Sequence, residues 1–331
     1  MGTKQIMRFL ALICVCMMLW WSACTQSSTT SKPKPLTPYK PLAPACSGDS
    51  AMKWAKQQVD FGPRVPGTKA HKNCAAFFET ELKRLGLVTH IQNGPTKTYD
   101  GKQFTLHNII ASYAPEKQKR ILILAHWDSR PIADEDSERT NEPIDGADDG
   151  ASGAAVMLEV ARLVALHKPD CGVDFFFNDL EDYGEPRNST FPPMADSWCL
   201  GTQYFATHPF RQGYMPRFGI LLDMVGAKGA VFPKEGTGLQ YAAPFISEVW
   251  QTAADLGYSE FFTNQEMGAT TDDHLYINKL MGIPCLDIVH MNPSTGTYGT
   301  HHHTHRDNIS IIDSNTLQMV GQVVLETIWK Q

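Results

Sequence analysis

The sequence lacks an excess of basic residues. Its 331 residues include 29 Lys and Arg against 35 Asp and Glu, which gives a formal net charge of −6 at pH 7. Proteins that bind nucleic acid usually carry a basic patch or stripe, and this composition gives no sign of one. Nucleic acid is therefore not expected among the partners of this protein.

Long apolar runs are also scarce, apart from one near the N-terminus. That run covers residues 9–21, and roughly 13 residues are too few for an ordinary membrane-spanning helix. A basic start precedes the run, and two small residues and then Cys24 follow it. This layout predicts a lipoprotein-type signal peptide over residues 1–23, because a cysteine directly after two small residues resembles the bacterial lipoprotein box. A plain signal peptide with a chance cysteine is the alternative.

The leader also predicts where the protein is found. We expect an exported, periplasmic protein that touches a bacterial membrane only through a lipid anchor at Cys24. Residues 24–45 are rich in Pro, Ser and Thr, a composition that cannot bury a core and suits an extended tether. Residues 46–331 are then expected to form a single α/β domain, which is large for one domain but normal for a single α/β enzyme.

No two cysteines are separated by exactly two residues, which argues against a zinc site made of thiolates. An exported protein can form disulfides, but an odd number of cysteines leaves at least one thiol over. Cys285 stands within an apolar run and is expected to be a buried free thiol. The pairing of the other cysteines stays open. Beyond the leader and Cys24, the cysteines are Cys46, Cys74, Cys171, Cys199 and Cys285.

Apolar runs alternate with amphipathic stretches along the rest of the chain. Continuous apolar runs suit strands that are buried on both faces, and the amphipathic stretches between them suit helices. Such alternation predicts a three-layer α/β/α sandwich with a largely parallel, mixed central sheet. The expected strands lie at 105–113, 120–125, 172–178, 217–224 and 284–290, and the expected helices at about 49–60, 69–87, 150–167, 200–207, 240–256, 272–281 and 313–329.

Acidic and histidine residues gather at the ends of the expected strands, at the starts of two expected helices and in the loop after the last strand. Loops beyond the carboxyl ends of parallel strands meet in one crevice, which is where open α/β sheets bind ligands. Carboxylates brought so close together repel one another unless a cation compensates them, and imidazole and carboxylate groups are typical zinc ligands. Each cluster alone is weak evidence for a metal site, because acidic residues often serve only as helix caps. The residues concerned are His126, Asp128, Asp148, Asp149, Asp179, Glu181, Asp182, Asp223, Asp272, Asp273, His274, His301, His302, His303 and His305.

Six motifs follow one another along about residues 50–330: AHWDSR, GADDGASGAAVMLE, FFFNDLEDYG, LLDMVG, TDDHLY and HHTHRDN. In this order they resemble the zinc aminopeptidase superfamily, and more narrowly its glutaminyl cyclase branch of the bacterial type. The resemblance implies a zinc-aminopeptidase-like fold, a catalytic domain, and one Zn²⁺ ion per chain.

The resemblance also implies which residues hold the metal. The zinc ligands would be Asp149, Asp182 and His303. Asp182 stands where animal cyclases usually have Glu, which is a departure from the family pattern. A cis peptide bond is expected between Asp149 and Gly150. His126 matches a ligand of the second metal in the aminopeptidase branch.

The same resemblance implies residues for catalysis and substrate binding. Glu181 would be the general acid/base, and Asp223 and Asp272 match the acidic residues around the substrate amine in cyclases. Trp198 and Tyr298 are candidates for the walls of a small pocket over the glutaminyl side chain. Ordinary packing is the alternative for both aromatic residues.

Two reactions fit these residues. In a cyclase the substrate's own α-amine attacks the γ-carboxamide of an N-terminal Gln and expels ammonia, with zinc as a Lewis acid. An aminopeptidase generally uses two metals to activate a water. The motif TDDHLY, the His-Thr pair at 303–304 and the nearby aromatic residues favour the cyclase. We therefore predict a zinc-dependent glutaminyl-peptide cyclotransferase that acts on N-terminal Gln of peptides or exported proteins. A di-zinc aminopeptidase is the alternative.

Overall fold

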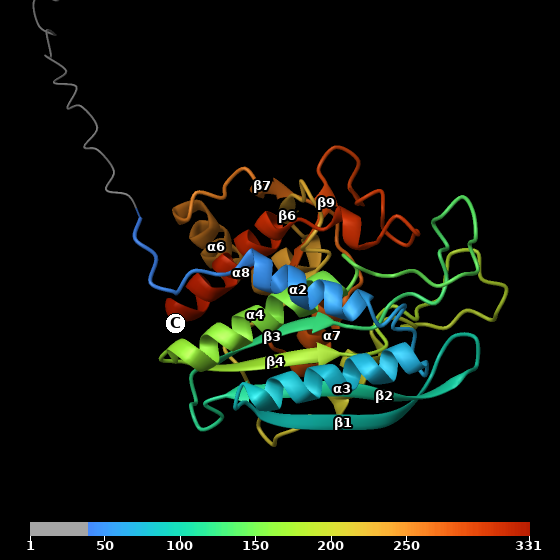
Figure 1. The fold of residues 1–331 in the computed structure, drawn as a ribbon, viewed down its shortest axis with the longest axis horizontal. Coiled ribbons are helices and arrows are strands. Elements are labelled where there is room, and N and C mark those ends of the chain that lie inside the picture. Colours follow the sequence, from blue (N-terminus) through green and yellow to red (C-terminus); the bar gives the residue numbers. More distant parts are fainter. Residues whose placement is uncertain (1–38) are drawn as a thin grey trace, which may run out of the picture. The chain divides into compact units, whose positions relative to one another are not determined.

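The computed structural model describes residues 39–331 (Figure 1). The expected signal peptide, Cys24 and most of the expected tether lie outside these residues. A compact unit runs from Lys40 to Gln331. Its first residues are fastened to the last helix, because the backbone N–H of Leu42 donates to the Glu326 carboxylate at 3.0 Å. Within the described residues, no helix has both the length and the apolar character that crossing a membrane requires.

A six-stranded mixed sheet forms the middle layer of the domain. Its last four strands in spatial order run parallel, and β1 and β2 add antiparallel pairs at one edge. The predicted largely parallel sheet is therefore confirmed. In spatial order the strands are β1 (Val88–Lys97), β2 (Gln103–Tyr113), β4 (Gly172–Asn178), β3 (Arg120–His126), β5 (Gly219–Asp223) and β8 (Cys285–Val289).

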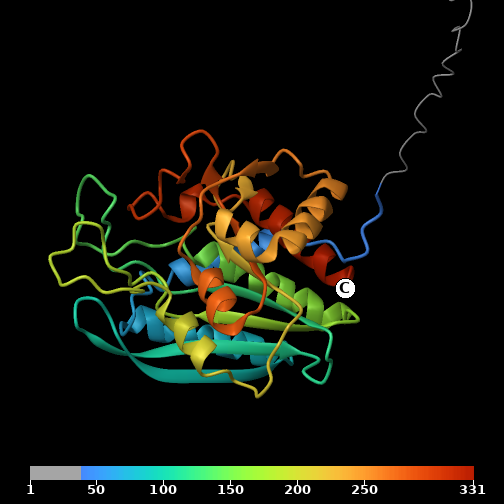
Figure 2. The same cartoon turned by 180° about the vertical axis from the view of Figure 1, so that it is seen from behind.

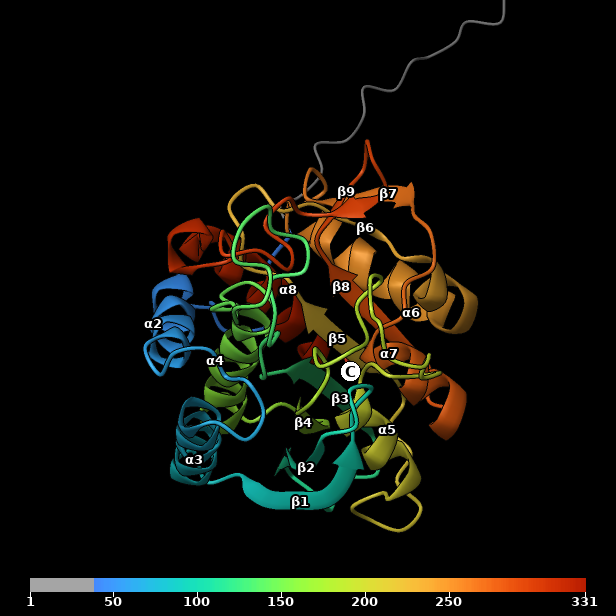
Figure 3. The same ribbon diagram turned by 90° about the vertical axis from the view of Figure 1, so that its right-hand side faces the viewer.

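Helices cover both faces of this sheet (Figure 3). One face carries α3 (Lys69–Arg84) and α4 (Ala151–His167), and α2 (Gly48–Val59) and α8 (Ser314–Trp329) pack against α4. The other face, seen in Figure 2, carries α5 (Leu200–Thr207), α7 (Asp273–Tyr276) and the π-helical segment η1 (Ile277–Met281), while α6 (Gly236–Asp255) packs against β8. The short elements are β6 (Phe232–Lys234) paired with β7 (Phe262–Glu266), β9 (Met291–Asn292) paired with β10 (Thr297–Tyr298), and the 3₁₀ turn η2 (Ile309–Ile311).

The side chains of β3 alternate between two cores. Ile121 and Ile123 belong to the larger core, which includes α4 and α8. Leu122 and Leu124 belong to the core on the opposite face, together with Phe205 of α5. Successive residues of a strand point to opposite faces, and every residue of β3 is buried. Burial on both faces explains why the middle of the strand, residues 121–125, is apolar throughout.

The edge strand β1 is not expected from the sequence pattern. It alternates between exposed and buried residues and includes Gly94 and Pro95, which are unusual in strands. Proline is tolerated because β1 lies at the edge of the sheet. Gly94 is required because a Cβ there would lie 2.2 Å from the ring of Tyr204.

Two further expectations concern a helix and the thiols. The helix expected over 272–281 is divided into the short α7 and the π-helical η1. The prediction that Cys285 is a buried free thiol is confirmed. The other cysteines of the described residues, Cys46, Cys74, Cys171 and Cys199, are buried and free as well.

Candidate metal and active site

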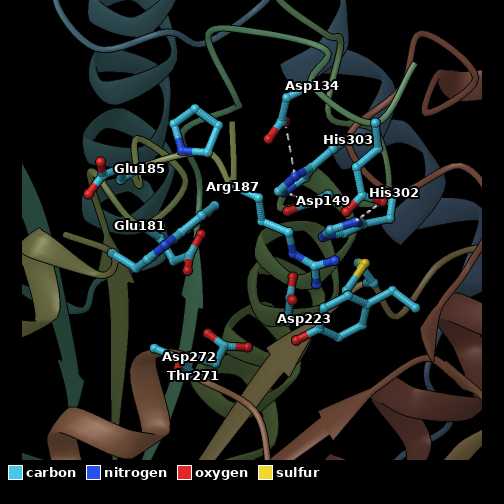
Figure 4. Close-up of a pocket in the computed structure, with 15 residues that line it drawn as sticks. Asp134, Asp149, Glu181, Glu185, Arg187, Asp223, Thr271, Asp272, His302 and His303 are labelled. Carbon is cyan, nitrogen blue, oxygen red and sulfur yellow. Dashed lines mark hydrogen bonds and ion pairs between the residues drawn. The ribbon is translucent and has the colours of Figure 1, made fainter. Parts of the chain in front are cut away.

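Acidic and histidine side chains meet at the carboxyl edge of the sheet. His126 is the last residue of β3, and Asp223 is the last residue of β5. Asp149 shortly precedes α4, and Glu181 and Asp182 shortly follow β4. Parallel strands bring their carboxyl ends to one edge, so these residues converge although they are far apart in the sequence. In Figure 4, Asp149, Glu181 and Asp223 surround one cavity.

Asp149, Asp182 and His303 form a group that is suited to hold a metal ion. One ligand atom from each residue lies within 4.8 Å of the others, and all three residues are buried. His303 Nε2 is 3.2 Å from Asp182 Oδ1 and 3.8 Å from Asp149 Oδ2. Asp182 Oδ2 is buried and accepts no hydrogen bond from any described residue. A buried carboxylate oxygen without a donor is costly, so the group fits a bound cation, and its imidazole and carboxylates fit zinc.

A second group joins His126 to Asp149 and Asp223. His126 Nε2 is 3.0 Å from Asp149 Oδ1 and 3.2 Å from Asp223 Oδ1. One ligand atom from each of the three residues lies within 4.8 Å of the others. In this group each carboxylate has an oxygen within 3.2 Å of the imidazole. The group therefore lacks the evidence for a bound cation that the unpartnered Asp182 Oδ2 gives for the first group.

The backbone beside the metal group has an unusual geometry. The peptide bond between Asp149 and Gly150 is cis, as expected. A Cβ at Gly150 would lie 2.5 Å from His126 Nε2, so glycine leaves room for the imidazole beside Asp149. Asp307 holds this segment, because its carboxylate accepts from the backbone N–H groups of Asp148 at 2.7 Å and Asp149 at 3.1 Å. The sequence shows Asp307 only as part of the last motif and gives it no role.

The histidine-rich loop places one imidazole in the metal group. His303 Nδ1 lies 3.3 Å from Asp134 Oδ1, and Arg130 Nε donates to the same oxygen at 2.5 Å. A carboxylate on the far nitrogen fixes the orientation of a metal-binding imidazole. Asp134 carries no sequence signal, since it lies in a long loop, whereas Arg130 ends the motif AHWDSR. The neighbouring histidines face other carboxylates: His301 pairs with Asp148, His302 with Glu135, and His305 with Asp136.

Asp128 holds Glu181 and Asp182 in place together. Its two carboxylate oxygens accept the backbone N–H groups of Glu181 at 3.1 Å and of Asp182 at 3.2 Å. Glu181 lines the cavity, while Asp182 belongs to the metal group. Cys199 Sγ donates to Glu181 Oε1 at 3.2 Å. The sequence places Asp128 and Cys199 among the notable residues but does not reveal either contact.

Glu181 shares the cavity with Asp223 and Asp272. Burial raises the pKa of Glu181 well above its usual value, His126 opposes this shift and the charge of Asp272 adds to it. Burial also raises the pKa of Asp272 well above its usual value, with the charge of Asp223 as the next cause. Carboxyls with raised pKa values suit proton exchange with an amine. Asp272 is a helix cap as well, because it accepts the backbone N–H of Asp273 at 2.6 Å.

The cavity has a volume of about 260 Å³, and Trp198 and Tyr298 both line it. The rings of Trp198 and His303 are nearly parallel, with centroids 5.9 Å apart. The Arg130 guanidinium lies 4.6 Å from the centroid of the Trp198 ring, a distance at which a cation is attracted to the ring face. Trp198 therefore links the metal group to the wall of the cavity.

Residues 108–328 match the model of Peptidase family M28. This segment makes up more than half of the chain, and the protein belongs to this family. The mixed sheet with helices on both faces and the strand-end residues agree with that membership.

Three solved structures resemble the chain at a TM-score of 0.85 each. A Zn-dependent exopeptidase from Parabacteroides distasonis is 45% identical, with 87% of this chain and 100% of that chain covered. The glutaminyl cyclase of Bacteroides thetaiotaomicron, bound to N-acetylhistamine, is 44% identical, with 87% and 99% covered. A leucine aminopeptidase precursor from the same organism is 43% identical, with 88% and 100% covered.

The matches to the curated relatives cover a smaller share of those proteins than the matches to the solved structures do. The chain spans 44%, 45% and 32% of the length of the first three, less than half in each case. The family is therefore established, and the reaction is a matter for proposal.

The metal group leads to a prediction about zinc content. Metal analysis of protein purified without added zinc should give a ratio of about one zinc per chain. His303→Ala should lose most of the metal, because it removes one of three protein ligands. Glu181→Gln should keep the zinc while turnover falls at least about a hundredfold, since a general acid/base typically contributes 10²–10⁴-fold.

Two results would contradict this assignment. Loss of zinc in Glu181→Gln would place the ligand at Glu181 instead of Asp182. A ratio of two zinc ions per chain, reduced to one by His126→Ala, would show that the second group holds an ion too.

Proposed function

We propose that this protein is a zinc-dependent glutaminyl-peptide cyclotransferase, which converts the N-terminal Gln of a peptide into pyroglutamate and releases ammonia. The observation that carries the proposal is the group of Asp149, Asp182 and His303, which is suited to hold a metal ion, beside a small cavity that Glu181, Asp223 and Asp272 line. The similarity to the glutaminyl cyclase of Bacteroides thetaiotaomicron supports the same reaction.

In this reaction the substrate supplies its own nucleophile. The α-amine attacks the γ-carboxamide carbon, the bond from that carbon to the carboxamide nitrogen breaks, and ammonia leaves. Glu181 accepts a proton from the amine and returns it to the departing nitrogen, so the carboxyl ends in its starting state. Zinc bound by Asp149, Asp182 and His303 supplies a Lewis acid for the carboxamide oxygen.

Asp223 and Asp272 orient the amine in the proposed reaction. Both carboxyls line the cavity together with Glu181, so they can accept the N–H groups of the amine while Glu181 takes the proton. Trp198 and Tyr298 wall the same cavity. Attack by water would yield Glu instead of pyroglutamate, so apolar walls that limit the access of water favour ring closure.

A di-zinc aminopeptidase is the second candidate function. His126, Asp149 and Asp223 come together closely enough to share an ion, and one similar structure is a leucine aminopeptidase precursor. This second group does not decide between the two reactions. The cavity that Glu181, Asp223 and Asp272 line together, and the similarity to a glutaminyl cyclase, favour the cyclase.

The purified protein distinguishes the two reactions directly. Incubated with a Gln-peptide, it should release ammonia and leave a pyroglutamyl peptide with all its peptide bonds intact. A Leu-anilide should stay uncleaved, because it has no side-chain carboxamide for its amine to attack. Mass spectrometry of the peptide and an ammonia assay measure the first outcome. Hydrolysis of the Leu-anilide at a comparable rate would identify an aminopeptidase.

The proposed mechanism also predicts a pH dependence that belongs to the substrate. Only the neutral α-amine can attack, and its pKa is about 7.7–8.0. Below that pKa, kcat/KM should rise roughly tenfold per pH unit, and above it kcat/KM should level off. For two Gln substrates whose α-amine pKa values differ, the acidic limb should shift with the substrate. An identical acidic limb for both would mean that an enzyme group controls it, and the mechanism would be wrong.

We further propose that the enzyme is exported to the periplasm and held on a bacterial membrane by a lipid at Cys24. The signal-like residues 1–23 and the Pro/Ser/Thr-rich residues 24–45 support this location. The substrates would then be peptides or exported proteins with an N-terminal Gln. Cys24→Ser should move the protein from the membrane fraction to the soluble fraction on immunoblots. Unchanged membrane association would contradict the anchor.

A further inference from the structure

Arg187 differs from the other basic side chains near the active site. It is the only Lys or Arg among the described residues that line the active-site cavity, and its side chain points into that cavity (Figure 4). Arg187 is exposed, and within residues 39–331 its side chain forms no hydrogen bond, ion pair or ring contact. By contrast, Arg130 is buried and donates to Asp134. Arg187 is therefore free to bind a ligand.

Three cavities meet at Arg187. The active-site cavity of about 260 Å³ shares Tyr298 and Glu135 with a cavity of about 780 Å³, and it shares Trp198 and Glu185 with another of about 480 Å³. Arg187 lines all three, and it is the only Lys or Arg among the described residues lining any of them. A peptide that leaves the active-site cavity through either neighbour passes this side chain.

The loop that carries Arg187 is fixed at its base. The backbone N–H of Glu185 donates to Ser197 Oγ at 3.0 Å, and Glu185 Oε2 accepts the backbone N–H of Met194 at 2.9 Å. Pro186 is buried directly before Arg187. These contacts hold the backbone at the mouth of the cavity, while the guanidinium remains accessible.

The other charged groups around the mouth are carboxylates. Asp134 and Glu135 line the active-site cavity and the larger neighbour, and Glu185 lines the active-site cavity and the smaller one. Asp134 is paired with Arg130 and Glu135 with His302, so Glu185 is the one of the three without a basic partner among the described residues. Arg187 is the basic group that is left for a substrate, and a guanidinium can donate two parallel N–H groups to one carboxylate.

We propose that Arg187 is a specificity-determining residue that contacts the second residue of the peptide substrate and favours an acidic side chain there. This inference rests on the cyclase reaction proposed above. When the N-terminal Gln occupies the active-site cavity, the second residue of the peptide lies at the mouth of that cavity. Among the described residues that line the cavity, Arg187 is the one Lys or Arg. The substrate class is then peptides that begin with Gln-Glu or Gln-Asp.

Two peptides of nearly equal shape test the proposal. Gln-Glu-Ala-amide and Gln-Gln-Ala-amide differ in the charge of the second residue, and kcat/KM is measured for both with each enzyme variant. The ratio of the two values should fall about fivefold in Arg187→Ala, since a partly exposed ion pair contributes up to about 1 kcal/mol. The loss should appear mainly in KM. Arg187→Lys should keep part of the preference, and Arg187→Glu should lower the ratio further.

The ratio does not depend on how much of a preparation is folded, because the same sample turns over both peptides. Arg84→Ala is the matched control, since Arg84 is an exposed arginine on α3 that pairs with Glu81 and lines none of the three cavities. Its ratio should equal that of the unmodified enzyme. Equal ratios in the unmodified enzyme, Arg187→Ala and Arg187→Glu would overturn the proposal and leave the cyclase reaction standing. If the zinc-loaded enzyme released ammonia from neither peptide, the cyclase proposal would fail and this inference with it.

Discussion

Carboxylates that are buried together repel one another, and the active site depends on how this repulsion is compensated. The strand order of the sheet makes the crowding unavoidable, because four parallel strands deliver their carboxyl ends to one edge. Different carboxylates have different partners. Backbone N–H groups serve Asp128 and Asp307, the His126 imidazole serves Asp149 and Asp223, and one oxygen of Asp182 is left for a cation.

Two buried carboxylates position the site, and each accepts hydrogen bonds from two consecutive backbone N–H groups. Asp128 binds the consecutive N–H groups of Glu181 and Asp182, and Asp307 binds those of Asp148 and Asp149. A shift of either backbone segment would therefore move a candidate metal ligand and its neighbour together. The buried carboxylate of Asp128 thus positions the proposed general acid/base, Glu181, relative to the metal group.

The sequence predicts the central sheet well because strands buried on both faces are continuous apolar runs. It does not reveal β1, since an edge strand that contains Gly94 and Pro95 lacks that pattern. The candidate ligands follow from motifs and their order. Among three consecutive histidines the motif points to His303, and the fold places this imidazole beside Asp149 and Asp182. The contacts of Asp134 and the position of Arg187 depend on loops, whose geometry no periodicity encodes.

The five cysteines of the described residues are all buried and unpaired, so the folded domain shields each of these thiols from solvent. Global unfolding would expose them together. In an oxidising solution, thiol–disulfide chemistry would then join them in pairs that the fold does not contain. Refolding would compete with this covalent trapping, and denaturation would become irreversible without a reductant. In an oxidising compartment the lifetime of the domain is then set by its unfolding rate and not by its equilibrium free energy of unfolding.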